Sequence, residues 1–199
     1  MKLNTIASSF LILVLGGTLL FGAVSCKKEV LPKPISFLRL DYPQEEYVSL
    51  PSGFPYHFEH AKGIRVIPKE NFMMDLKYPT MNATLVLSYF PVKENLKALL
   101  KDAEKLTFKH MIKADDIQST PYENKDSKVY GKLFEVYGDA ATQIQFHVTD
   151  STDNFITGAL YFYAKPNYDS IYPAVMHLKK DVVHLMETLT WKELEKPKF

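Results

Sequence analysis

Residues 127–166 read SKVYGKLFEVYGDAATQIQFHVTDSTDNFITGALYFYAKP, and this stretch decides the fold. It holds three runs of recurring or alternating apolar residues, which two short polar breaks separate: Val129–Tyr137, Thr142–Thr149 and Phe155–Tyr163. Short strands joined by such breaks pair with their sequence neighbours in an antiparallel meander. We therefore predict three consecutive antiparallel strands.

The second and third runs differ in how many faces are apolar. In the second run, apolar and polar side chains alternate: Ile144, Phe146 and Val148 against Gln143, Gln145 and His147. This alternation predicts a half-buried strand. The third run is apolar on both faces, which predicts a strand in the middle of a covered sheet.

The rest of the chain supplies more strands and a cover for the sheet. We expect strands at Ile64–Ile67, Asn71–Lys77 and Ala83–Tyr89, and amphipathic helices at about Val92–Lys113 and Ile171–Leu189. Residues 115–127 read as a polar connection. The order βββαβββα predicts an α+β fold, with an antiparallel sheet of about six strands covered by two helices. This order resembles that of the PsbP extrinsic protein of photosystem II, which implies a sandwich but no function.

The amino terminus predicts export and lipid anchoring. Residues 1–25 read as a signal peptide, with Lys2 before the apolar run Phe10–Phe21, which is too short for a comfortable membrane span. Ala23-Val24-Ser25-Cys26 resembles a bacterial lipobox, although leucine is commoner where Ala23 stands. Cys26 is the single cysteine, so we expect it to carry a diacylglycerol and an acyl chain such as palmitate, and no intramolecular disulfide can form.

Charge and composition narrow the partners and divide the chain. The 24 basic and 23 acidic residues become 23 of each once Lys2 leaves with the signal peptide, so nothing favours a nucleic-acid partner. A run of acidic residues just after the lipidated cysteine would resemble a signal for export to the cell surface. Only Glu29 fits such a run, so we expect a protein that faces the periplasm. Residues 26–55 carry the lipidated cysteine and a proline-rich tether that straps onto the domain. Residues 56–192 form a single α+β domain, and residues 193–199 a frayed tail.

No constellation of side chains indicates catalysis or metal binding. His57, Glu59 and His60 alternate along an expected strand, so His60 points away from the other two, and no cysteine is near. The histidines of the expected helices lie beside apolar stripes and read as half-buried: His110, His177 and His184. A Ser151, His147 and Asp150 triad lacks a nucleophile elbow. We predict no cofactor, no metal and no enzyme.

Two turn motifs resemble the periplasmic O-glycosylation signal of the Bacteroidetes. They are Asp150-Ser151-Thr152 and Asp169-Ser170-Ile171, and they make Ser151 and Ser170 candidate modification sites. The same residues also fit ordinary turn and helix-cap chemistry, which leaves both interpretations open.

The chain as a whole resembles a known family. The residues that carry the resemblance are 32–34 (PKP), 37–43 (FLRLDYP), 54–59 (FPYHFE), 102–107 (DAEKLT), 109–110 (KH), 113–117 (KADDI), 148–170 (VTDSTDNFITGALYFYAKPNYDS) and 187–192 (ETLTWK). They are similar to those of the gliding-motility lipoprotein GldD family of the Bacteroidetes. The resemblance implies a lipid-anchored envelope component needed for gliding, tied to the secretion apparatus for motility adhesins, with no enzymatic site.

The resemblance also implies one contact. Relatives often place cysteines where Phe54 and Phe72 stand, so the two phenylalanines are expected to pack together.

Two function hypotheses follow. The first is a non-catalytic scaffold that meets membrane or secretion partners through the strap and through tyrosines such as Tyr122, Tyr130 and Tyr168. The second is a small-ligand-binding periplasmic lipoprotein, which requires a deep apolar pocket between sheet and helix.

Overall fold

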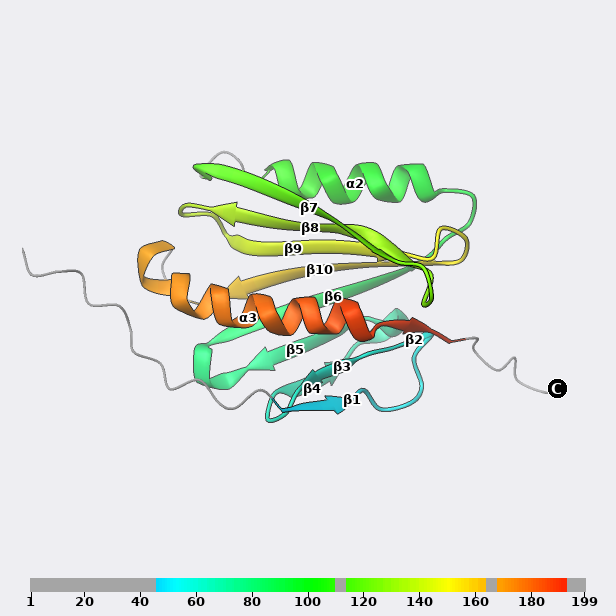
Figure 1. The fold of residues 1–199 in the computed structure, drawn as a ribbon, viewed down its shortest axis with the longest axis horizontal. Helices are drawn as coiled ribbons and strands as arrows, with labels where there is room; N and C mark the ends of the chain where they lie inside the picture. The colour runs from blue at the N-terminus through cyan, green and yellow to red at the C-terminus, as the bar shows by residue number, and fades with distance from the viewer. Residues whose placement is uncertain (1–45, 110–113, 164–167, 193–199) are drawn as a thin grey trace, which may run out of the picture. The chain divides into compact units, whose positions relative to one another are not determined.

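A computed structural model describes residues 46–109, 114–163 and 168–192, and the main feature of this part is one antiparallel sheet (Figure 1). Its seven strands have the order β4-β5-β6-β10-β9-β8-β7. Their bounds are β4 Arg65–Pro68, β5 Met74–Tyr78, β6 Ala83–Pro91, β7 Asp116–Asn124, β8 Val129–Tyr137, β9 Thr142–Thr149 and β10 Asn154–Phe162. Every neighbouring pair is antiparallel, which confirms the predicted α+β class.

The meander β8-β9-β10 forms as the polar breaks predict. β10 occupies the centre of the sheet, between β6 and β9, because both of its faces are apolar. Phe155 and Ile156 are each 1% exposed although they point to opposite faces. The central place expected for this strand is therefore confirmed.

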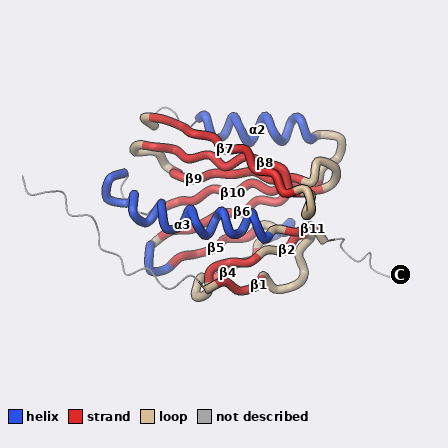
Figure 2. The backbone as a smooth tube through the Cα atoms, in the orientation of Figure 1, coloured by secondary structure: helices blue, strands red, loops and turns tan. Residues whose placement is uncertain are grey.

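Two helices cover opposite faces of the sheet (Figure 2). Helix α3 (Tyr168–Thr188) contacts the face of Glu135, whose carboxylate accepts a 2.7 Å bond from Lys179. Helix α2 (Leu96–Lys109) contacts the face of Gln145, whose Oε1 accepts a 3.0 Å bond from Thr107. In the register Glu135 pairs with Ile144, the neighbour of Gln145, so the two side chains point to opposite sides.

The core lies mainly between the sheet and α3. Its buried members from α3 recur at helical spacing: Val175, Leu178, Val182, Leu185, Met186 and, just after the helix, Leu189. They meet fully buried strand residues such as Leu85 and Leu160. The predicted apolar stripe is therefore the contact surface, and each such side chain contributes about 1.5–3 kcal/mol when buried.

Strand β9 is buried on both faces, so the predicted half-buried strand is wrong. The three polar side chains Gln143, Gln145 and His147 are only 2%, 5% and 2% exposed. They lie on the face that α2 covers, where Gln145 also bonds Thr142 at 2.6 Å and Gln143 bonds the Ala140 carbonyl at 2.8 Å. Hydrogen bonding to neighbours allows polar side chains to occupy a covered strand.

Strand β7 corrects a second expectation. Residues 116–124, expected within a polar connection, form a nine-residue strand at one edge of the sheet. Most of its side chains are exposed, so no apolar pattern marks it. Pro121 lies in its middle, which an edge strand tolerates because one side of its backbone needs no partner. The opposite edge strand, β4, ends in Pro68.

Several element ends also differ from the prediction. Helix α2 begins at Leu96 rather than Val92, and α3 begins at Tyr168 rather than Ile171. The strand expected from Asn71 begins at Met74, because Asn71 has a positive φ of 55° within the short 3-10 helix Glu70–Phe72.

Two small strand pairs join the ends of the described chain to the domain. β1 (Tyr47–Ser49) pairs with β3 (Glu59–Ala61), and β2 (Tyr56–His57) pairs with β11 (Thr190–Trp191). Residues 1–45, which include Cys26 and most of the predicted tether, lie outside the described residues. Among the described helices, none has the length and apolar character to cross a membrane.

Candidate functional site

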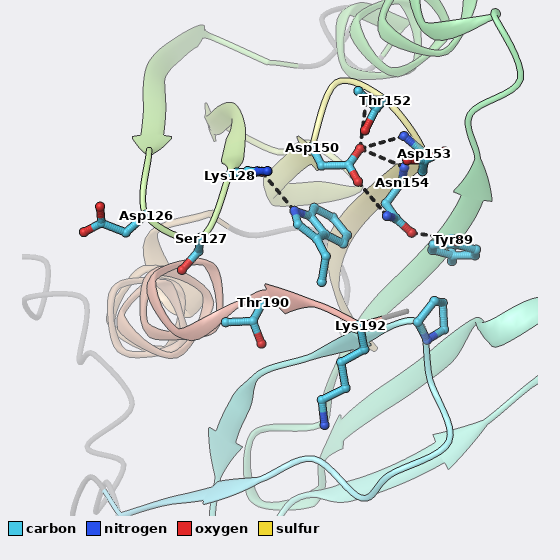
Figure 3. A pocket seen from close by; sticks show the side chains of 12 residues that line it. Tyr89, Asp126, Ser127, Lys128, Asp150, Thr152, Asp153, Asn154, Thr190 and Lys192 are labelled. Atoms are coloured by element: carbon cyan, nitrogen blue, oxygen red, sulfur yellow. Dashed lines mark hydrogen bonds between the residues drawn. The ribbon is translucent and has the colours of Figure 1, made fainter. Parts of the chain in front are cut away.

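A cleft of about 640 Å³ lies at one end of the sheet (Figure 3). Three segments that are distant in sequence line it, at 126–128 between β7 and β8, at 150–154 between β9 and β10, and at 190–192 after α3. Pro55 and Tyr89 complete the lining. The meander brings the two turns together, and the pairing of β11 with β2 adds the third segment.

Asp150 organises the turn at 150–154. Its Oδ1 accepts hydrogen bonds from three backbone N–H groups, those of Thr152 at 2.9 Å, Asp153 at 2.8 Å and Asn154 at 2.9 Å. Its Oδ2 accepts a 2.6 Å bond from the Asn154 side chain. Partial burial alone would raise the pKa of Asp150, but these bonds outweigh it and hold the pKa below its usual value.

Further hydrogen bonds fix the walls of the cleft. The Tyr89 hydroxyl donates to Asn154 Oδ1 at 2.8 Å, as the dashed line in Figure 3 shows. The indole Nε1 of Trp191 donates to the backbone carbonyl of Lys128 at 2.9 Å, and the Lys192 N–H donates to the carbonyl of Pro55 at 2.9 Å. The two turns and the end of the chain are thereby held in one arrangement.

Other polar groups of the cleft remain open to solvent. Within the described part of the chain, seven side chains of the lining have no hydrogen bond or ion pair: Asp126, Ser127, Lys128, Thr152, Asp153, Thr190 and Lys192. They offer hydroxyls, carboxylates and ammonium groups to a ligand. Among these described side chains, no nucleophile is hydrogen-bonded to a base.

The structure does not assemble the Ser151, His147 and Asp150 combination. His147 lies under α2, with ring centroids 5.8 Å from both Phe134 and Phe155. His147 is therefore enclosed between α2 and the sheet and does not lie at the turn that holds Ser151. Its burial, and then the nearby Lys132, lower the pKa of His147 to about 4, and its Nδ1 has no partner among the described residues. Ser151 lies outside this layer, exposed in the turn with φ 71°.

The His57, Glu59 and His60 segment alternates as predicted. His60 is buried, whereas Glu59 faces α3, where its carboxylate lies within hydrogen-bond distance of His184 Nε2, at 2.9 Å. The His184 ring stacks on Tyr47 with centroids 3.7 Å apart. Within the described part of the chain, no group of three ligating side chains could hold a metal ion. His110 lies outside the described residues.

The remaining predicted residues have these positions. Phe54 and Phe72 both adjoin Tyr56, whose ring centroid lies 5.6 Å from that of Phe54 and whose hydroxyl donates to the Phe72 carbonyl. Direct contact between the two phenylalanines stays a prediction. Ser151 is exposed, and Ser170 lies in the first turn of α3.

A cavity between α2 and the sheet measures only about 90 Å³. Sites for drug-sized ligands have about 300–1,000 Å³. A second cavity, which His177 and Asp181 of α3 help to line, measures about 250 Å³. Both volumes lie below that range, so neither cavity provides the deep pocket that the ligand-binding hypothesis requires.

An aromatic surface cluster lies at the start of α3. We call Tyr137, Tyr168, Tyr172 and Met176 the α3 cluster. Ring centroids are 6.0 Å apart for Tyr137 and Tyr168 and 5.4 Å apart for Tyr168 and Tyr172. Tyr172 is 37% exposed and Met176 39% exposed, and they are neighbours at four-residue spacing. Of these residues only Tyr168 was predicted from the sequence, although the spacing of 168, 172 and 176 could have indicated a shared helix face.

The cleft is not predicted by the sequence, because each of its three segments reads as an ordinary turn or as the end of an element. The signal available was local: an aspartate followed by polar residues and Asn154 predicts a side-chain-bonded turn.

Comparison with known proteins identifies the family. Residues 27–191 match the sequence model described as gliding motility lipoprotein GldD. A search among curated proteins finds no significant match. Because the matched region covers most of the chain, this protein belongs to the GldD family of gliding motility lipoproteins, which are lipid-anchored cell-envelope proteins involved in gliding.

Proposed function

We propose that this chain is a non-catalytic scaffold of the gliding machinery, anchored through Cys26, facing the periplasm, and linked to the secretion of motility adhesins. The observation that carries the proposal is the α3 cluster. Tyrosine and methionine are enriched in protein–protein interfaces, and this cluster places them at the surface of a packed helix.

The contacts that the titratable side chains make support a non-catalytic role. Asp150 stabilises a turn, Glu59 contacts His184, and His147 is enclosed between two phenylalanine rings. Active sites instead group perturbed titratable residues in a cleft. Among the described residues, the histidine with a strongly lowered pKa lies under α2. In the cleft, the carboxylate of Asp150, whose pKa is lowered, bonds the turn's N–H groups and the Asn154 side chain rather than a base.

Crosslinking in intact cells tests the proposal. A photoreactive amino acid at position 169, an exposed site on the same helix about one turn before Tyr172, should capture envelope partners in the otherwise wild-type chain, and fewer when Cys26→Ala is added. The double change Tyr172→Ser and Met176→Ser should reduce both capture and gliding. Tyr163→Ser, which alters a 64% exposed tyrosine at the end of β10, serves as the matched control. Unchanged capture and gliding in the double variant would contradict the proposal.

We also propose that at least one of the two motif serines, Ser151 in the turn before β10 or Ser170 in the first turn of α3, carries an O-linked glycan. The exposure of Ser151 in a turn supports it as the more accessible acceptor. Intact-mass measurement of the protein from its native envelope, before and after Ser151→Ala and Ser170→Ala, tests this. The same spectrum reports the acyl mass on Cys26.

A further inference from the structure

We propose that the cleft at the end of the sheet binds a neutral oligosaccharide and stacks one sugar ring on the indole of Trp191. The cleft volume of about 640 Å³ lies within the range of about 300–1,000 Å³ that ligand sites occupy. This binding site is separate from the α3 cluster and goes beyond the proposed scaffold role.

The chemistry of the open side chains favours a sugar. A sugar hydroxyl both donates and accepts hydrogen bonds, and the cleft offers both kinds of partner. The carboxylates of Asp126 and Asp153 accept, the ammonium groups of Lys128 and Lys192 donate, and the hydroxyl of Thr152 does either. A hydroxyl that donates to a carboxylate makes one of the stronger hydrogen bonds.

The same lining disfavours other ligands. The three carboxylates of the cleft outnumber its two ammonium groups, so an anion such as phosphate gains little. An apolar ligand would cover charged groups without pairing them, which is costly. Asp150, whose two oxygens already accept four hydrogen bonds, is not available to coordinate a cation.

Trp191 supplies the apolar surface that a sugar ring needs. Its side chain is partly buried against the core and also lines the cleft. Its Nε1 is already bonded to the Lys128 carbonyl, which fixes the orientation of the indole. The face of an aromatic ring carries partial negative charge and attracts the weakly positive C–H groups on one side of a sugar.

The cleft is also preorganised. The Asp150 bonds hold one wall, and the Tyr89–Asn154 bond ties that wall to β6. A rigid wall lowers the ordering cost of binding. Peptides usually bind along a free strand edge or an apolar groove, whereas this lining consists mainly of turns.

The chain carries its own reporter. Trp191 is the only tryptophan among the 199 residues, so its fluorescence reports this cleft alone. Full-length protein, in a detergent without sugar groups, is titrated with chitotetraose, maltotetraose, tetra-alanine and sodium phosphate. We expect a saturable change with at least one oligosaccharide. Chitotetraose would indicate an amino-sugar glycan of the cell-wall type, and maltotetraose a neutral glucan.

Variants locate the binding. Asp153→Ala and Thr152→Val alter exposed side chains and leave the reporter in place, and each should weaken binding about tenfold, a loss of about 1.4 kcal/mol. Tyr163→Ser, at the other end of β10, should bind as the wild type does. A response to tetra-alanine or phosphate alone, no response to either sugar, or equal affinity in all variants would overturn the proposal.

Discussion

The hydroxyl of Tyr47 donates a hydrogen bond to Oδ1 of Asp181, 3.1 Å away, and thereby joins the first described strand to helix α3. Asp181 is only 6% exposed, so its carboxylate depends on such partners. The hydroxyl of Tyr78 is a second partner of the Asp181 carboxylate. Burial, and then the neighbouring Asp181, raise the pKa of Tyr78 well above its ordinary value.

Tyr47→Phe should lower the free energy of unfolding by about 1–3 kcal/mol, because a buried carboxylate loses a donor. Urea titration should show a lower midpoint with an unchanged slope. Tyr163→Phe removes a hydroxyl from a 64% exposed ring and should have no effect. Equal midpoints for the two variants would show that the Tyr47 bond contributes nothing to stability.

His147 makes stability depend on pH. Burial lowers its pKa to about 4 in the folded protein, whereas the unfolded chain has the ordinary value of 6.5. Between these values the unfolded chain binds more protons, so stability falls as the pH is lowered from 6.5 towards 4. The full loss from this group is about 3 kcal/mol at most.

His147→Phe should remove this part of the pH dependence. The measurement is the unfolding free energy of both proteins at pH 7 and at pH 5, and the change between the two pH values is compared between variant and wild type. The variant should lose less stability than the wild type between the two pH values. Parallel losses would mean that His147 is protonated without cost in the folded protein.

Asp150→Ala should destabilise the cleft turn, because three backbone N–H groups lose their acceptor. Loss of hydrogen bonds to a charged group costs about 2–3 kcal/mol, which corresponds to a fall in Tm of about 4–12 °C for a chain of this size. Asp153→Ala, which removes an exposed carboxylate, is the control and should leave Tm nearly unchanged. Calorimetry distinguishes the two variants, and similar Tm values would refute the turn's dependence on Asp150.

The backbone of β9 approaches Gly131 too closely for a side chain. A Cβ at this position would lie 1.9 Å from the His147 carbonyl oxygen, and a strand backbone has little freedom to shift. Gly131→Ala should therefore cost about 3 kcal/mol or more, at the upper end of overpacking effects. Thermal unfolding is the measurement, and Ser119→Ala on the exposed edge strand β7 is the control. A fully stable Gly131→Ala protein would exclude the close approach.

The predicted neighbourhood of Phe54 and Phe72 can be tested covalently. In a chain that also carries Cys26→Ser, the pair Phe54→Cys and Phe72→Cys should form a disulfide under oxidising conditions, because both positions adjoin Tyr56. Counting free thiols in the unfolded protein decides the matter. Two free thiols after oxidation would contradict the predicted contact.

The sequence predicts elements well where burial depends on one periodic pattern. Strands β8 and β9 begin and end at the predicted residues, because polar turns bound clear apolar runs. Strand β7 gives no such signal, since an exposed edge strand needs no apolar side chains and Pro121 argues against a strand. The double burial of β9 depends on α2, whose position over Gln145 no local pattern contains.

The candidate site was harder to predict than the fold. Its lining comes from segments at 126–128, 150–154 and 190–192, which only the pairing of distant strands brings together. Trp191 lies at the end of the predicted domain, and its bond to Lys128 spans 63 positions, a distance that no local pattern reports. Family resemblance gave the envelope location and the role in gliding, but it named no binding residue.

Both outer strands of the sheet contain a proline, Pro68 in β4 and Pro121 in β7. Members of a lipid-anchored family are confined to two dimensions, where copies collide edge to edge far more often than in free solution. An unbroken outer strand would let such copies join into a continuous ribbon through backbone hydrogen bonds. Each of these edges lacks one N–H donor at its proline, so the two prolines disfavour such a ribbon between copies held on one membrane.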